Sequence, residues 1–228
     1  MEVGHVRSGS GSDVGRRREK NEDSYLEDED RRLFVVADGM GGHPSGEVAS
    51  REAVAALDRA LSNGALDAAD RMKALTDALV AAHEAVVATA TTEPEKRGMG
   101  TTAVVVHLDE DDGTMTCAHI GDSRAYVLAV DRFVRVTEDH VWGGQGGRSL
   151  TQAIGSSKEV EPEAAEVDLN AGDKILLCTD GLTDMLDDRE IRDILAKDAD
   201  AQTLCDELIA SALDHGGVDN ITCIVIEV

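Results

Sequence analysis

Short apolar runs that are hydrophobic at consecutive positions constrain the fold of this 228-residue chain more than any other feature. Their Val, Ile and Leu content, their shortness and the Gly or Asp beside them favour strands over helices. A strand that is apolar on both faces has to be covered on both faces. The predicted strands are residues 33–37, 103–108, 114–119, 125–128, 174–179 and 221–228.

Helical patterns fall in groups between these strands. Layered helices over sheets are therefore expected, and regular β-α alternation is not. In the second helix Met72, Leu75, Leu79, Val86 and Val87 recur at helical spacing. The predicted helices begin near Pro44–Glu47, and span about residues 68–90, 188–196 and 201–213.

Glycine-rich segments interrupt the pattern at two places: residues 8–12 predict a turn, and residues 143–147 predict a flexible stretch. Neither is long enough to link two domains, so we expect residues 1–228 to form a single domain. Cys117, Cys178, Cys205 and Cys223 are widely spaced and lie mostly in apolar runs. They are interpreted as reduced core thiols, and not as disulfide or zinc ligands.

The formal charge of −24 argues against nucleic acid or an anionic membrane as a partner, because most of the surface would repel phosphate. Solubility explains this charge, and adaptation to high salt is an alternative hypothesis. No stretch approaches the roughly 18 to 20 apolar residues of a membrane helix, and the first residues lack a signal-peptide core. We expect a monomeric cytoplasmic protein.

Aspartates follow several of the predicted strands. Asp38-Gly39 and Asp180-Gly181 each end an apolar run, Asp122 follows another, and Asp219 precedes the last. A single Asp-Gly most often marks an ordinary turn. Carboxylates that converge must take up protons or bind cations. Oxygen ligands without a His or Cys set favour Mg²⁺ or Mn²⁺ over Zn²⁺.

A charged segment near the N-terminus adds Arg18, Glu22 and Asp23. Arg18 could hold a phosphate through charge-assisted hydrogen bonds, and Glu22 or Asp23 could support metal-bound water. Taken alone, the segment is better explained as a solvated run of charges.

In order along the chain, these segments resemble the metal-dependent protein phosphatases of the 2C class, especially the compact bacterial members. An ordered set of motifs over nearly the whole chain is far more specific than any one of them. The matching segments are Ser12–Gly15 with Arg18, Asn21–Ser24, Ala37–His43, Gly98–Thr102, His119–Tyr126, Leu150–Gly155, Cys178–Leu182 and Asp219–Thr222.

The resemblance implies an α+β fold, a four-layer α-β-β-α sandwich with two mainly antiparallel sheets. It also implies Mn²⁺ or Mg²⁺, two ions per active site, and hydrolysis of phosphoserine and phosphothreonine by a metal-activated water. The expected substrates are proteins phosphorylated by serine/threonine kinases in signalling. In metal binding, Asp38 would bridge the ions, the Gly39 carbonyl would complete one, and Asp180 and Asp219 would bind the other.

Further roles follow from the same resemblance. Glu22 and Asp23 would hold metal-bound waters, and Asp122 with the Ser149 carbonyl would bind a third, weaker ion. Arg18 would hold the substrate phosphate.

The chain departs from the family pattern at the flap, where residues 139–150 replace a subdomain of a few dozen residues. We expect a more open site with weak discrimination among phosphopeptides. Met40 stands where some members have a histidine, so no protein general acid is assigned. Trp142 is interpreted as an anchor of the short loop, with substrate contact as the alternative. A binding-only protein and a small-molecule phosphohydrolase are the competing functions.

Overall fold

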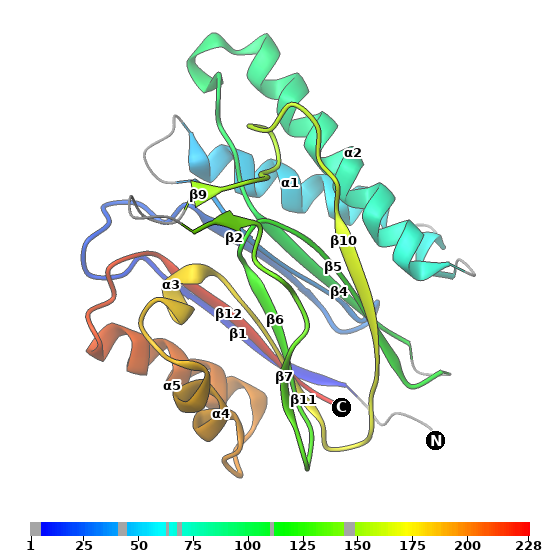
Figure 1. The fold of residues 1–228 in the computed structure, drawn as a ribbon, viewed down its shortest axis with the longest axis vertical. Helices are drawn as coiled ribbons and strands as arrows, with labels where there is room; N and C mark the ends of the chain where they lie inside the picture. The colour runs from blue at the N-terminus through cyan, green and yellow to red at the C-terminus, as the bar shows by residue number, and fades with distance from the viewer. Residues whose placement is uncertain (1–5, 41–44, 63, 68–69, 110–111, 144–148) are drawn as a thin grey trace.

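Two five-stranded antiparallel sheets lie face to face between two layers of helices in the computed structural model (Figure 1). The structure describes residues 6–40, 45–62, 64–67, 70–109, 112–143 and 149–228. The first sheet has the order β1 (Arg7–Asp13), β12 (Ile221–Glu227), β11 (Lys174–Cys178), β6 (Arg124–Leu128), β7 (Phe133–Arg135). The second has the order β10 (Glu163–Asp168), β5 (Thr114–Ile120), β4 (Ala103–Asp109), β3 (Leu33–Asp38), β2 (Asp23–Asp28).

Helices cover the outer face of each sheet. The second sheet carries α1 (Gly46–Ala60) and α2 (Arg71–Thr92), and the first carries α3 (Asp180–Thr183), α4 (Asp188–Leu195) and α5 (Ala201–Asp214). Short 3₁₀ helices span Ala65–Asp67 and Pro94–Lys96, and β8 (Val141–Trp142) pairs with β9 (Ser149–Leu150) in a separate hairpin. Within the described residues, no helix is both long and apolar enough to span a bilayer.

The strands are apolar at consecutive positions because their two faces pack into different hydrophobic cores, of which there are three. In β3, Leu33, Val35 and Ala37 pack under α1 and α2, whereas Phe34 and Val36 face the first sheet. A third core lies between the first sheet and α4 and α5. Complete burial of each Val, Leu or Ile contributes about 1.5–3 kcal/mol, so both faces of these strands stabilise the sandwich. The predicted strands, the grouped helices and the four-layer fold class are confirmed.

The turn predicted at residues 8–12 is wrong, because this segment forms strand β1, paired with β12 along its length. Its glycines permit α5 to lie directly on the strand. A Cβ at Gly9 would lie 2.3 Å from the backbone nitrogen of Gln202, and one at Gly11 would lie 2.6 Å from Ile209 Cδ1. Glycine here marks close helix packing and not a change of direction.

The apolar face of α2 is narrower than predicted. Leu75, Leu79 and Val86 are buried as expected, but the side chains of Met72 and Val87 are 42% and 36% exposed. All four cysteines are buried free thiols, which confirms their interpretation as core residues.

Candidate active site

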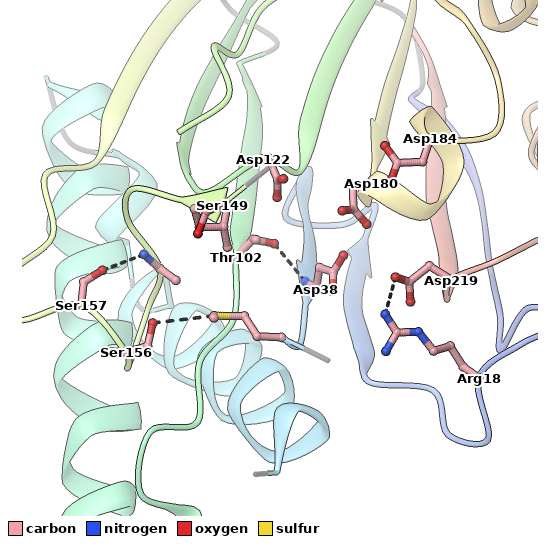
Figure 2. Close-up of a pocket in the computed structure, with 13 residues that line it drawn as sticks. Arg18, Asp38, Thr102, Asp122, Ser149, Ser156, Ser157, Asp180, Asp184 and Asp219 are labelled. Atoms are coloured by element: carbon pink, nitrogen blue, oxygen red, sulfur yellow. Dashed lines mark hydrogen bonds and ion pairs between the residues drawn. The ribbon is translucent and has the colours of Figure 1, made fainter. Parts of the chain in front are cut away.

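A pocket of about 530 Å³ lies at the edge of the sandwich where several strands end (Figure 2). It gathers six of the residues predicted from sequence, although they come from distant parts of the chain. They are Arg18, Asp38, Asp122, Ser149, Asp180 and Asp219.

The backbone holds Asp38 firmly at the end of β3. Its N–H donates to Thr102 Oγ1 at 3.1 Å, and its carbonyl accepts from the N–H of Thr102 at 2.9 Å. The next residue, Gly39, donates its N–H to the Glu22 carbonyl, and a Cβ there would meet the Gly46 carbonyl oxygen at 2.4 Å. Glycine is needed here because the backbone passes so closely.

Asp180 and Asp219 are brought together by contact between their neighbours. Asp180 begins α3, directly after β11, and Asp219 lies just before β12. A Cβ at Gly181 would lie 1.8 Å from the carbonyl oxygen of Asn220, so only glycine allows these two turns to touch.

The pocket is short of positive charge. Burial, followed by the negative charges of Asp23 and Asp180, raises the pKa of Asp38 well above its usual range. Arg18 Nη2 lies 2.6 Å from Asp219 Oδ2, and this hydrogen bond chiefly raises the pKa of Arg18. These carboxylates therefore favour additional cations.

Asp23 lies beside Asp38, to which it is paired in the β2–β3 register. Thr222 Oγ1 donates to Asp23 Oδ2 at 2.6 Å, and Thr179 Oγ1 donates to the same oxygen at 3.0 Å. Its Oδ1 is buried and finds no hydrogen-bond partner among the described residues. Burial is the main reason why the pKa of Asp23 is raised. An orphaned carboxylate oxygen is costly, which fits a role in holding water or a cation.

Glu22 lies next to the pocket and does not line it. A Cβ added to Gly46, at the start of α1, would lie 2.9 Å from Glu22 Oε1. The Glu22 carbonyl accepts a hydrogen bond from Ser50 Oγ at 2.6 Å. Burial and the neighbouring Glu47 raise the pKa of Glu22.

Asp122 and Ser149 complete the predicted set. Asp122 is buried, after Gly121 with φ +101°, and Ser149 comes from β9 on the same side of the pocket (Figure 2). Gly41, Gly42 and His43 of the motif after Asp38, and the loop residues 144–148, lie outside the described residues.

Sequence reasoning missed several residues that line the pocket. Asp184 is the most relevant, because its N–H donates to the Asp180 carbonyl at 2.7 Å and its carboxylate adds another charge. The spacing of four residues between the two aspartates is one helical turn and could have indicated this. Met40 lies with its sulfur 3.7 Å from Ser156 Oγ. The others are Thr102, Leu150, Ala153, Ser156 and Ser157.

The donor set fits hard divalent cations. Apart from the Met40 sulfur, the potential side-chain ligands among the described lining residues are carboxylate and hydroxyl oxygens. Such ligands suit Mg²⁺ and Mn²⁺. The repelling carboxylates and the orphaned Asp23 oxygen agree with that choice.

A second group of potential ligands consists of His119, His140 and Glu163. His140 Nδ1 accepts from the N–H of Gly121 at 3.2 Å, so neutral His140 carries its proton on Nε2, 3.5 Å from Glu163 Oε1. A metal cannot share that protonated nitrogen. The two imidazoles stack with centroids 4.6 Å apart. This group therefore packs the segment before β8 against β5.

This packing predicts loss of stability in mild acid. Burial, and then His140, lower the pKa of His119 from 6.5 to about 4. At pH values between these two pKa values, the unfolded state binds more protons than the folded state, so the stability of the fold decreases as pH falls. From pH 7.5 to 5, His119 should cost the wild type about 2 kcal/mol that His119→Asn does not lose. Urea unfolding of both proteins in EDTA measures this, and equal losses would contradict it.

Comparisons with known proteins show which family the chain resembles. Residues 11–213 match the family model described as protein phosphatase 2C. The chain is 32% identical to the protein phosphatase PhpP of Streptococcus pneumoniae, over 92% of this chain and 93% of that protein. The structure resembles the catalytic domain of serine/threonine protein phosphatase PstP in complex with two manganese ions. That match has a TM-score of 0.85 and 33% identity, and covers 97% of each chain.

A further structural match is PppA, described as a key regulatory component of the T6SS in Pseudomonas aeruginosa. It has a TM-score of 0.87 and 33% identity, covering 99% of this chain and 98% of that one.

Proposed function

Because this chain belongs to the protein phosphatase 2C family, we propose that Asp38, Asp180 and Asp219 hold two divalent cations for the hydrolysis of phosphoserine and phosphothreonine in proteins. The chain is a metal-dependent protein serine/threonine phosphatase. Asp38 lines the pocket together with Asp180 and Asp219, whose charges it experiences, and we assign it the bridging position, with the Gly39 carbonyl as a further ligand.

The observation that carries this assignment is the convergence of repelling carboxylates beside one arginine. Two divalent cations bound in the pocket would supply an activated water and neutralise charge on the phosphoryl group. Asp38, Asp180 and Asp219 would hold these cations. Asp23, oriented by Thr179 and Thr222, would hold a metal-bound water through its unpartnered Oδ1, and Glu22 would support that water.

Arg18 binds the substrate phosphate in this account. Its guanidinium pairs with Asp219 in this structure and so occupies the place at that carboxylate where a metal ion would bind. A metal held by Asp219 would neutralise its charge, and the Arg18 guanidinium would then be free to bind phosphate with paired hydrogen bonds.

The proposal also covers a third cation, the choice of metal and the setting in which the enzyme acts. Asp122, Ser149 and the newly found Asp184 line the pocket and are candidates for a weaker third cation. Either Mn²⁺ or Mg²⁺ satisfies the oxygen ligands. We further propose a single-domain, monomeric, cytoplasmic enzyme of bacterial type. It would reverse serine/threonine kinase signalling, without nucleic-acid or membrane partners.

The test is turnover of a phosphothreonine peptide by purified protein with Mn²⁺, with Mg²⁺ and with EDTA. We expect activity with metal and none in EDTA. Free sugar phosphates should be poorer substrates. Folded protein that binds phosphopeptide but gives no turnover with either metal would instead support the binding-only function, and a preference for sugar phosphates would support a small-molecule phosphohydrolase.

Replacing Arg18 should impair the enzyme without removing its metals. Arg18→Gln loses charged hydrogen bonds to phosphate, and we expect kcat/KM to fall about 30- to 100-fold. Mn²⁺ affinity, measured calorimetrically, should be unchanged or higher because the arginine no longer competes for Asp219. The matched control is Arg16→Gln, since Arg16 is on the same loop but pairs with Asp214. Equal effects of both substitutions would count against the assignment.

A further inference from the structure

Trp142 is exposed beside the pocket, although a large aromatic side chain is usually at least partly covered. It is 73% exposed, and it is the only tryptophan in the sequence. The interpretation of this residue as an anchor packed on the core is therefore wrong. Because the indole is exposed to solvent beside the pocket, it is available to contact a ligand.

The β8–β9 hairpin connects Trp142 to the pocket. Trp142 is directly opposite Ser149 in the register, and Ser149 and Leu150 both line the pocket. Residues directly opposite in an antiparallel pair project from the same face. The indole and Ser149 therefore share one face of the hairpin, at the side of the pocket.

The base of this hairpin is fixed to the residues next to Asp122. The His140 N–H donates to the Gly121 carbonyl at 3.0 Å, and the Thr151 N–H donates to the His140 carbonyl at 2.8 Å. A Cβ on Gly143, the residue after Trp142, would meet nothing within 4 Å among the described residues. The exposed indole is therefore accessible to a substrate segment that leaves the pocket.

The charge of the molecule selects the kind of residue that would bind there. The whole chain has a formal charge of −24, and two divalent cations bound by the pocket carboxylates would offset only four of these charges. Such a field attracts positively charged segments and repels acidic ones. The face of an indole is also the best aromatic surface for a cation.

We propose that Trp142 is a docking contact for a lysine or arginine side chain that flanks the phosphorylated residue of a substrate protein. This inference rests on the phosphatase function proposed above. It predicts a modest preference for basic segments and not for one sequence motif, which is consistent with an open site.

Kinetics on matched substrates test the contact. Wild type should hydrolyse a phosphothreonine peptide with flanking arginines about three- to tenfold more efficiently than the same peptide with glutamines. In Trp142→Ala, most of this preference should disappear, and what remains should be due to general charge attraction. Trp142→Phe should have an intermediate preference. Val130→Ala, which changes an exposed apolar residue on the β6–β7 hairpin, is the control and should keep it all.

Hydrolysis of p-nitrophenyl phosphate separates this inference from the function itself. That substrate has no flanking residue that could contact Trp142, so all the variants should turn it over like the wild type. If the arginine preference is the same in wild type and Trp142→Ala while both hydrolyse the peptides, the contact is refuted and the phosphatase function stands.

The single tryptophan also gives a direct reading of binding. We expect the emission of Mg²⁺-loaded protein to change on titration with a non-hydrolysable phosphonate peptide that carries flanking arginines, and to change less with the glutamine peptide. Binding of the arginine peptide, detected by competition, without any emission change would overturn the proposal.

Discussion

Replacing Asp38 with asparagine should lower phosphopeptide turnover by about a thousandfold or more, equivalent to about 4 kcal/mol of transition-state stabilisation. Asp38 lines the pocket and experiences the negative charges of both Asp180 and Asp219, so we assign its carboxylate the bridging position. Asparagine keeps the shape but offers a neutral oxygen in place of a charged one. Initial rates with Mn²⁺ measure the loss, and calorimetry should show weakened Mn²⁺ binding.

The same substitution should leave the metal-free protein folded and somewhat more stable. Burial and neighbouring carboxylates oppose ionisation of Asp38, and asparagine removes that cost. The control is Asp58→Asn, because Asp58 lies on α1 and pairs with Arg31. Asp38→Asn with near wild-type turnover would contradict the proposed role, whereas loss of turnover with higher thermal stability would exclude misfolding as its cause.

A methyl group on Gly181 should be nearly as damaging, although glycine offers no side chain to the reaction. The added Cβ would lie 1.8 Å from the Asn220 carbonyl oxygen, a backbone atom that cannot move alone. Separating these turns moves Asp180 away from Asp219. We expect Gly181→Ala to reduce turnover about a hundredfold or more, since small misplacements of this kind are costly. Overpacking should also lower stability by about 1–3 kcal/mol.

Gly143→Ala is the matched control, because a Cβ there meets nothing within 4 Å. It should retain wild-type turnover and stability. Mn²⁺ titration should give a weaker affinity for Gly181→Ala than for the control. Wild-type activity and metal affinity in Gly181→Ala would show that the spacing of these two turns is unimportant.

Local patterns predicted much of the sandwich, because a strand buried on both faces has a distinctive composition. The runs at β3, β4, β5, β6, β11 and β12 are apolar at consecutive positions for this reason. Strand β1 could not be recognised in the same way. Its glycines resemble a turn until α5 is placed against them, and that contact joins residues nearly 200 positions apart.

The candidate site was predictable where each residue follows a strand, and less so where distant segments meet. Asp38 and Asp180 are marked by the glycine that follows them. The hydrogen bonds from Thr179 and Thr222 to Asp23, and the pairing of Arg18 with Asp219, join segments that only the fold brings together. Trp142 was misjudged because exposure depends on what surrounds a residue in three dimensions.

Anomalous scattering from crystals grown with Mn²⁺ tests the central claim most directly. The account predicts two strong peaks about 4 Å apart in the pocket, with Asp38 in contact with both and with Asp180 and Asp219 as ligands. In the same crystals Arg18 should have left Asp219. A single peak, or manganese bound elsewhere while the pocket carboxylates keep their present hydrogen bonds, would contradict the assignment of these residues.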